Sequence, residues 1–329
     1  MTDQIYLFVF GLILLIKGGD WFVDGATAIA RKFHLPELLI GATVVSIGTT
    51  LPEVLVSTTA AIGGNGSIAY GNAIGSIICN TALISAITIA VKPGKVDKKT
   101  LILPVCFFFT SAVFYALTAY LGGRFSRLTG IILLAVFAVY MSVLIYNMKK
   151  TPKTLELTPE DYEADGEKAP LWRSVLFLVL GAALIALGAD LLVDNGTKIA
   201  TALGVPDTVI ALTFVALGTS LPELVTAITA LMKGHGALSL GNIIGANLFN
   251  LVLVSGMAIT VNPFDVPAGA TVGGINASLV IDIPVMFAVM LLMTVPALIK
   301  GKLSRWQGIS LLAIYAAFCT LQFVLPFIA

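Results

Sequence analysis

The sequence Thr43-Val-Val-Ser-Ile-Gly-Thr-Thr-Leu-Pro-Glu53 returns in the second half of the chain as Thr213-Phe-Val-Ala-Leu-Gly-Thr-Ser-Leu-Pro-Glu223. Each copy places a glutamate in a long apolar segment, directly after a proline that we expect to break the helix. A charged side chain inside a membrane helix is costly and by default indicates a functional site. Two glutamates at equivalent points of two halves therefore predict one shared site.

The composition is that of a membrane protein. Of the 329 residues, 58% are hydrophobic and 11% are charged, whereas a soluble domain carries about 25% charged residues. The net charge of +1 gives no electrostatic reason to expect nucleic acid as a partner. The cysteines show neither a metal-binding nor a disulfide pattern, and no Ser/His or Asp/Asp constellation suggests an enzyme. We expect a protein of the lipid bilayer without a cofactor or an obligate protein partner.

Apolar segments of about 20 residues can each span a bilayer, and the chain contains ten of them. They cover approximately residues 5–30, 37–62, 68–91, 101–121, 127–147, 172–200, 207–232, 238–260, 277–298 and 304–327. This pattern predicts a first five-helix repeat in 1–147, a polar linker in 148–171 and a second repeat in 172–329. The duplicated motif occupies 41–86 and 211–256. Because five is odd, the second repeat must enter the membrane from the opposite side, and we expect an all-α fold of two inverted repeats, which is frequent among transporters.

The basic residues predict the orientation. Lysine and arginine gather in the loops after the odd-numbered segments, whereas the opposite side holds only Arg124, Arg127 and Lys198. Cytoplasmic loops are enriched in these residues. We therefore expect both termini outside the cell and the 148–171 linker in the cytoplasm. The short loops favour a multi-pass protein of a prokaryotic inner membrane.

The duplicated motif is suited to supply oxygen ligands. Pro52 lacks an N–H group, so the carbonyl four residues earlier, at Gly48, loses its helical partner. Thr49 and Thr50 lie four and three residues before Glu53, which places both hydroxyls near its carboxylate on the helix. The second copy repeats the pattern with the following residues: Gly218, Thr219, Ser220, Pro222 and Glu223.

The third and eighth segments add a second duplicated pattern. Gly71-Asn-Ala-Ile-Gly-Ser76 precedes Asn80, and Gly241-Asn-Ile-Ile-Gly-Ala246 precedes Asn250. Ser76 and Asn80 are one helical turn apart. Asn72 and Asn242 fit two roles equally well, as cation ligands or as hydrogen-bonding groups between membrane helices. Carboxylates, hydroxyls, amides and freed carbonyls, without histidine or cysteine, indicate a hard cation such as Ca²⁺ or Na⁺.

These residues resemble the calcium/cation antiporter superfamily, and within it the prokaryotic sodium/calcium exchangers. Gly-Thr-Thr-Leu-Pro-Glu53, Gly-Thr-Ser-Leu-Pro-Glu223 and the two Gly-Asn segments look like the hallmarks of its two repeats. The resemblance implies that Glu53 and Glu223 bind Ca²⁺ at the centre of the membrane. By matching position, the other implied ligands are the side chains of Thr50, Ser220, Thr49, Thr219 and Ser76, together with the carbonyls of Ser46 and Ala216. Asn80 should face the centre of the cluster, and Asn250, its equivalent in the second repeat, is also a candidate ligand.

Three positions depart from the pattern that the resemblance implies. Asn250 stands where some exchangers carry Asp, Ala246 stands where a serine ligand is expected, and many members have Asn at the position of Ile77, as the second repeat has at Asn247. These departures leave the number of coupling ions and the choice of Na⁺ less certain than the fold. They also make the centre of the cluster, at Asn80 and Asn250, less acidic.

The expected function is exchange of Na⁺ for Ca²⁺ by alternating access, with both ions as transported substrates. The resemblance also implies that the first and sixth helices move against the other eight, and their glycines Gly18 and Gly188 are compatible with sliding. One alternative is a Ca²⁺/H⁺ or K⁺-dependent antiporter, in which the buried glutamates carry protons or the coupling ion differs. A cation channel with a glutamate filter is a second alternative, and conductance without a counter-ion would identify it.

Overall fold

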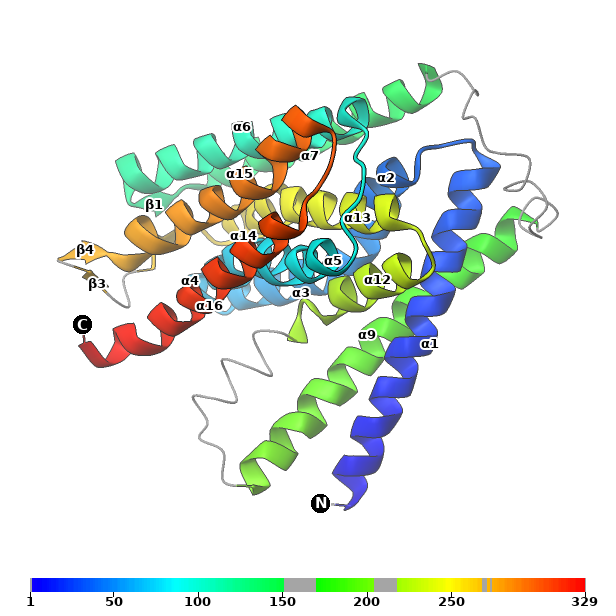
Figure 1. The fold of residues 1–329 in the computed structure, drawn as a ribbon. Coiled ribbons are helices and arrows are strands. Elements are labelled where there is room, and N and C mark those ends of the chain that lie inside the picture. The colour runs from blue at the N-terminus through cyan, green and yellow to red at the C-terminus, as the bar shows by residue number, and fades with distance from the viewer. Residues whose placement is uncertain (1, 151–169, 204–217, 268–270, 273, 329) are drawn as a thin grey trace. The chain divides into compact units, whose positions relative to one another are not determined.

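The computed structural model describes residues 2–150, 170–203, 218–267, 271–272 and 274–328, which fold almost entirely as helices (Figure 1). Eight helices in these ranges are long and apolar enough to cross a membrane: Thr2–Lys32, Glu37–Ile62, Gly66–Val91, Lys98–Gly122, Arg127–Asn147, Leu171–Ile199, Gly236–Val261 and Ser278–Lys300. The predicted seventh segment is represented by the shorter helix α12, Leu221–Met232, because 204–217 lie outside the described residues. The tenth contains α16, Arg305–Ile328. The count of ten spans stays a prediction.

Several spans are composite, because α-helix passes into π-helix and back within one membrane segment. The second comprises α2 (Glu37–Ile40), η1 (Gly41–Val45) and α3 (Ser46–Ile62); the third comprises α4 (Gly66–Cys79), η2 (Asn80–Ser85) and α5 (Ala86–Val91). The eighth comprises α13 (Gly236–Phe249), η4 (Asn250–Val254) and α14 (Ser255–Val261), and the ninth η5 (Ser278–Asp282) and α15 (Ile283–Lys300). π-Helical turns are rare and occur frequently at functional sites, so their positions mark regions for closer inspection.

The remaining spans are regular helices, and the strands are short loop pairings. The helices are α1 (Thr2–Lys32), α6 (Lys98–Gly122), α7 (Arg127–Lys150) and α9 (Leu171–Ala202). β1 (Arg124–Phe125) pairs antiparallel with β2 (Phe264–Asp265), and β3 (Thr271–Val272) pairs with β4 (Ile275–Asn276). These pairings connect loops and form no sheet core.

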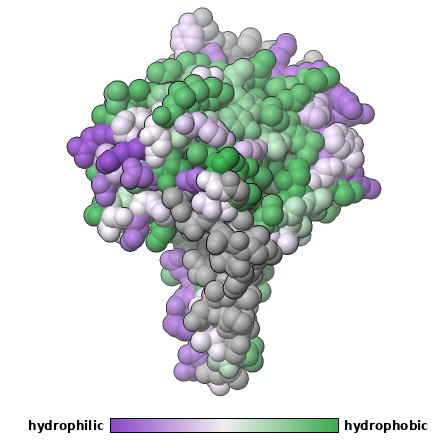
Figure 2. All heavy atoms as spheres, turned by 90° about the vertical axis from the view of Figure 1, so that its left-hand side faces the viewer, coloured by the Kyte–Doolittle hydropathy of each residue, from purple (hydrophilic) through white to green (hydrophobic). Residues whose placement is uncertain are grey.

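Large hydrophobic side chains are exposed along the helices. Leu55, Leu121 and Leu128 are each more than three-fifths exposed, and hydrophobic residues cover broad areas of the face seen in Figure 2. Apolar surface of this extent is unfavourable in water. In a bilayer the same side chains face lipid, and the helical backbone satisfies its own polar groups.

The described chain divides into two compact units. Unit 1 comprises Met1–Thr49 and Asn147–Asn242, and unit 2 comprises Thr50–Tyr146 and Ile243–Ala329. The chain passes from unit 1 to unit 2 between Thr49 and Thr50, inside α3, and again between Asn242 and Ile243, inside α13. Both duplicated motifs therefore contribute residues on either side of a unit boundary.

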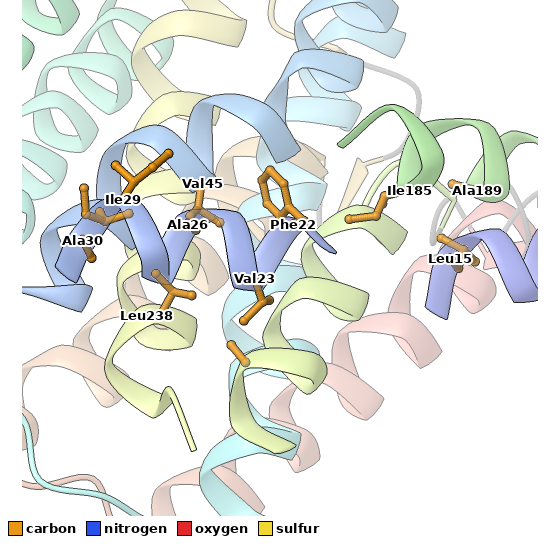
Figure 3. Close-up of a cluster of buried hydrophobic side chains, with 12 residues drawn as sticks. Leu15, Phe22, Val23, Ala26, Ile29, Ala30, Val45, Ile185, Ala189 and Leu238 are labelled. Atoms are coloured by element: carbon orange, nitrogen blue, oxygen red, sulfur yellow. The ribbon is translucent and has the colours of Figure 1, made fainter. Parts of the chain in front are cut away.

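Unit 1 is organised around α1 and α9, which pack antiparallel through glycines. A Cβ placed on Gly11 would lie 2.9 Å from the carbonyl oxygen of Gly188, and one placed on Gly25 would lie 2.5 Å from the backbone nitrogen of Leu178. Small residues permit such close approach of membrane helices. Phe22, Val23 and Ala26 of α1 join residues of neighbouring helices in one buried cluster (Figure 3).

Unit 2 contains an aromatic cluster that ties its loops to its helices. Tyr70 of α4, Tyr115 of α6 and Phe125 of β1 stack, with 4.5 Å between the ring centroids of Tyr115 and Phe125. Phe264 of β2 meets Phe125 edge to face at 5.6 Å. Such pairs stabilise beyond the area that they bury, and here they fix the β1–β2 loop pair to the helices.

Candidate cation-binding site

The first copy of the duplicated motif lies in α3, and its proline does not interrupt the helix. α3 runs through Pro52, so the expected break there is wrong. Proline is tolerated in membrane helices where neighbouring groups satisfy the freed carbonyl. The irregular backbone lies earlier, in η1, where the hydroxyl of Ser46 donates to the carbonyl oxygen of Gly41 over 2.7 Å. The polar chemistry of this motif therefore begins one turn before the threonines.

The second copy differs, because its glutamate lies at the beginning of a helix. Thr219 and Ser220 form a turn, α12 starts at Leu221, and Glu223 occupies its first turn. The N-terminus of a helix carries a partial positive charge that favours a carboxylate. Ala216, predicted to offer a carbonyl oxygen, lies outside the described residues.

Hydrogen bonds bring several predicted residues of unit 1 together around Asn242. The hydroxyl of Thr49 donates to Oδ1 of Asn242 over 3.2 Å, and the hydroxyl oxygen of Ser46, which donates to Gly41, lies 2.9 Å from the carbonyl oxygen of Asn242. The backbone oxygen of Ser46, a predicted ligand, lies 3.4 Å from the Thr49 hydroxyl. Within the described residues, the hydroxyl of Ser220 and Nδ2 of Asn242 are buried without a hydrogen-bond partner. Unit 1 thus contains a buried cluster with unused hydrogen-bonding capacity.

Both glutamates of the duplicated motif are completely buried, with 0% of Glu53 and of Glu223 exposed. The carboxylate of Glu223 has no hydrogen-bond partner among the described residues, and the side chain of Thr49 lies beside it. Burying an ionised carboxylate without compensation costs far more free energy than one hydrogen bond returns. Glu223 is therefore suited to hold a cation or a proton.

In unit 2, Asn72 connects α4 to α3. Its Nδ2 donates to the hydroxyl of Ser57 over 2.8 Å and to the backbone oxygen of Glu53 over 3.3 Å. This is the interhelical role that the sequence left open for Asn72. The contact holds the backbone of α3 at Glu53 against the neighbouring helix.

The remaining predicted residues of unit 2 are also buried. Thr50, Ser76, Asn80 and Asn250 are each at most 4% exposed. Among the described residues, the hydroxyl of Thr50 and both amide atoms of Asn80 and of Asn250 have no hydrogen-bond partner. Buried polar groups are nearly always satisfied by protein, water or an ion. The oxygens of these two amides and of this hydroxyl are therefore available for further interactions.

The two central asparagines share one backbone feature. η2 begins at Asn80 and η4 begins at Asn250. In η4 the hydroxyl of Ser255 donates to the carbonyl oxygen of Asn250 over 3.1 Å, five residues earlier. The wider π-turn changes the direction in which residues point relative to a regular helix. The repeat is thus visible in the backbone as well as in the sequence.

Sequence reasoning missed a buried network beside Asn250. Nδ2 of Asn247 donates to the hydroxyl of Thr81 over 2.7 Å and lies 3.3 Å from the sulfur of Met290. A polar side chain in an apolar segment was the available signal, but no pattern in the sequence paired Asn247 with Thr81. The network fixes α13 against η2 and α15.

The chemistry of these residues suits a hard cation. No group of three or more His, Cys, Asp or Glu side chains with metal-binding geometry occurs among the described residues. Carboxylate, hydroxyl and amide oxygens instead dominate, as Ca²⁺ sites require. Softer ligands would favour transition metals.

Comparisons with known proteins agree with this chemistry. The model of the sodium/calcium exchanger protein family matches residues 4–146 and 173–324. The putative antiporter CaxA of Alkalimonas amylolytica is 35% identical over 329 residues, which cover 99% of either chain. The sodium/calcium exchanger MaX1 of Methanosarcina acetivorans is 30% identical, with 98% of this chain and 99% of the relative covered. A solved structure of the sodium-calcium exchanger NCX_Mj is similar with a TM-score of 0.80 and 33% identity, covering 96% of this chain and 97% of the other.

Proposed function

Since the chain belongs to the sodium/calcium exchanger protein family, we propose that it exchanges Na⁺ for Ca²⁺ across the membrane by alternating access. The observation that carries this proposal is the complete burial of Glu53 and Glu223 in otherwise apolar helices. A membrane protein retains such carboxylates when they serve ions. The named exchangers among its relatives support the choice of Na⁺ and Ca²⁺.

The cation site that we propose is centred on Glu53 and Glu223, one from each repeat. Its support is their equivalence in the duplicated motif and the oxygen-rich residues that accompany each of them. Thr50, Ser76, Asn80 and Asn250 accompany Glu53 in unit 2. Ser46, Thr49, Thr219 and Ser220 accompany Glu223 in unit 1. Ala216 completes the proposed set by sequence equivalence with Ser46.

Competition for shared oxygens would couple the two ions. A Ca²⁺ ion neutralises two carboxylates, whereas each Na⁺ ion that binds the same oxygens adds one positive charge. An empty site would leave both carboxylates at membrane depth without the positive charge of a cation, which disfavours a conformational change without an ion. Because of this cost, the protein would carry one ion in exchange for another and would not let ions leak across the membrane.

We propose an arrangement of ten spans in two inverted repeats, with both termini outside and the 148–171 linker in the cytoplasm. The asymmetry of lysine and arginine supports this orientation. The shared start of η2 and η4 at Asn80 and Asn250 supports the repeat. The close glycine-mediated packing of α1 and α9 is compatible with movement of these two helices as a pair.

Transport in proteoliposomes tests the proposal. Vesicles loaded with Na⁺ should take up radiolabelled Ca²⁺, and Glu53→Gln or Glu223→Gln should abolish the uptake. Asp194→Asn is a matched control, because Asp194 is exposed and pairs with Lys198 on its own helix; this variant should transport normally. Uptake driven by a proton or K⁺ gradient without Na⁺ would show that H⁺ or K⁺, and not Na⁺, is the coupling ion. Unchanged uptake in both glutamine variants would refute the site.

A further inference from the structure

Two loops of unit 2 that are distant in sequence form a hydrogen-bonded pair rich in lysine. Residues 92–99 comprise the loop between α5 and α6 with the first residues of α6, and residues 300–305 comprise the loop between α15 and α16 with the adjoining helix ends. The backbone nitrogen of Val96 donates to Gly301 over 2.9 Å, and that of Leu303 donates to Gly94 over 2.8 Å. We call these residues the lysine loop pair.

A second pair of loops in unit 2 has the same backbone construction. There the nitrogen of Val266 donates to the carbonyl oxygen of Gly123 over 2.9 Å, as Val96 does to Gly301. Gly123 and Gly301 both have positive φ, 61° and 64°. We call residues 122–127 and 262–266 the arginine–aspartate loop pair.

An arginine anchors each pair in the same way. Arg305 donates from Nε to the carbonyl oxygen of Ala90 over 2.8 Å, at the end of α5. Arg127 donates from Nε to the carbonyl oxygen of Thr260 over 3.0 Å, at the end of α14. The two loop pairs are therefore structural equivalents, and their side chains can be compared position by position.

The residues that face each other have unlike charges in one loop pair and like charges in the other. In the arginine–aspartate loop pair, Arg124 faces Asp265 and forms a salt bridge of 3.7 Å. In the lysine loop pair, Lys95 faces Lys302 at the equivalent positions, and both are exposed. Like charges directly opposite each other are destabilising. The lysine loop pair therefore lacks a negative group that its counterpart contains.

Neighbouring residues strengthen this positive charge. Lys92, Lys99 and Lys300 are exposed in the same loops. The acidic residue of these loops is Asp97, whose carboxylate accepts the backbone N–H of Lys99 over 3.0 Å and the hydroxyl of Thr100. Asp97 is thus engaged in capping α6, and among the described residues no ion pair involves Lys95 or Lys302.

The lysine loop pair adjoins surface suited to the edge of a bilayer. Val91 and Ile299, which precede the loops, are 66% and 68% exposed, and Trp306 follows Arg305 with 47% exposed. Tryptophan is enriched at the level of lipid headgroups. Lysines that extend from such apolar helix ends, beside a tryptophan, are suited to the level of the lipid phosphate groups.

We propose that the lysine loop pair binds anionic phospholipid headgroups of the adjoining leaflet, with phosphate seated between Lys95 and Lys302. The missing counter-charge, the exposed lysines and the flanking apolar surface carry this inference, which does not depend on the transported ions. In basic clusters beside membrane helices, each lysine or arginine raises the affinity for anionic lipid about fivefold.

Native mass spectrometry of the full chain in detergent, titrated with phosphatidylglycerol or phosphatidylcholine, tests the inference. The wild type should retain phosphatidylglycerol preferentially. The double variant Lys95→Gln, Lys302→Gln should lose about thirtyfold in phosphatidylglycerol affinity, with phosphatidylcholine unchanged. Arg124→Gln alters the equivalent loop pair and should leave the preference intact. Equal losses in Arg124→Gln, or no lipid preference in the wild type, would overturn the assignment.

A second variant separates lipid binding from folding. Lys95→Asp would recreate the pairing of Asp265 with Arg124, so the loops should remain as stable as in the wild type or become more stable. In thermal unfolding, phosphatidylglycerol should raise the midpoint of the wild type and not that of Lys95→Asp. Displacement of the lipid by inorganic phosphate at equal concentration would indicate a free-phosphate site and contradict binding of a bilayer surface.

Discussion

The third and eighth spans have the same backbone but different oxygens. α4 and α13 each run for 14 residues before a π-helical segment that begins at an asparagine, Asn80 or Asn250. Four residues before that asparagine, the third span has Ser76 and the eighth has Ala246. The departure from α-helix therefore accompanies both copies of the duplicated motif, whereas the side-chain oxygens differ between the two copies.

The eighth span carries an amide where the third has an isoleucine. Thr81 donates its single hydroxyl proton to the carbonyl oxygen of Ile77 over 2.8 Å, so it must accept from Nδ2 of Asn247. This assignment of the amide leaves Oδ1 of Asn247 buried without a hydrogen-bond partner in the described part of the chain. The eighth span thus lacks a hydroxyl oxygen at Ala246 but has the amide oxygen of Asn247 at the next position, on a different side of the helix.

Within the third and eighth spans, the largest effect is expected from removing the shared asparagines. Asn80→Ala and Asn250→Ala each delete an amide that has no other described partner, so the loss should fall on ion binding. An interaction with a charged group contributes about 2 kcal/mol, which corresponds to a loss of about thirtyfold in Na⁺-dependent Ca²⁺ uptake at subsaturating Ca²⁺. A large loss in one variant alone would show that the two spans are not functionally equivalent.

Exchanging the residues at 76 and 246 should shift Na⁺ affinity in opposite directions. Ala246→Ser adds a hydroxyl and should lower the Na⁺ concentration for half-maximal exchange, whereas Ser76→Ala should raise it. Each change should be about tenfold, since a hydrogen bond or ligand contact contributes about 1.4 kcal/mol. Titration of Na⁺ in proteoliposomes at fixed Ca²⁺ measures both. Parallel shifts in the two variants would contradict the comparison.

Removing the Thr81 hydroxyl should affect stability more than ion binding. Thr81→Val deprives Asn247 of its acceptor and Ile77 of its donor, which should lower the free energy of unfolding by about 1 kcal/mol. Thermal unfolding in detergent measures the loss. Ser142→Ala is a control, because Ser142 is exposed and donates within its own helix. Destabilisation of the control to the same extent would remove any special role for the network.

The smallest effect is expected from the serines at the ends of the π-helical segments, Ser85 in η2 and Ser255 directly after η4. Ser255→Ala removes a hydroxyl that donates to the carbonyl oxygen of Asn250, and Ser85→Ala removes one that donates to Thr81. Hydrogen bonds in membrane proteins average about 0.6 kcal/mol, so both variants should unfold at only slightly lower temperature. A marked loss of transport in Ser255→Ala alone would indicate that this carbonyl must be held for Asn250 to function.

Several features of the site were predictable from sequence, and others were not. The burial of Glu53 and Glu223 follows from a duplicated apolar context, in which a charge is retained only for function. The continuity of α3 through Pro52 was not predictable, because neighbouring groups decide whether a proline breaks a membrane helix. The pairing of Asn72 with Ser57 was left open, since the sequence does not specify which helices are adjacent.

By itself, the sequence determined the membrane class, the duplicated motifs and the oxygen-based chemistry, because hydropathy and residue type act locally along the chain. Only the tertiary structure decided which oxygens are already used: the hydroxyls of Ser46 and Ser255 serve nearby carbonyls, while the amides of Asn80 and Asn250 stay without described partners. It also brought Lys95 opposite Lys302. Hydrogen-bond partners depend on backbone deviations and on distant segments, and neither can be read from local sequence.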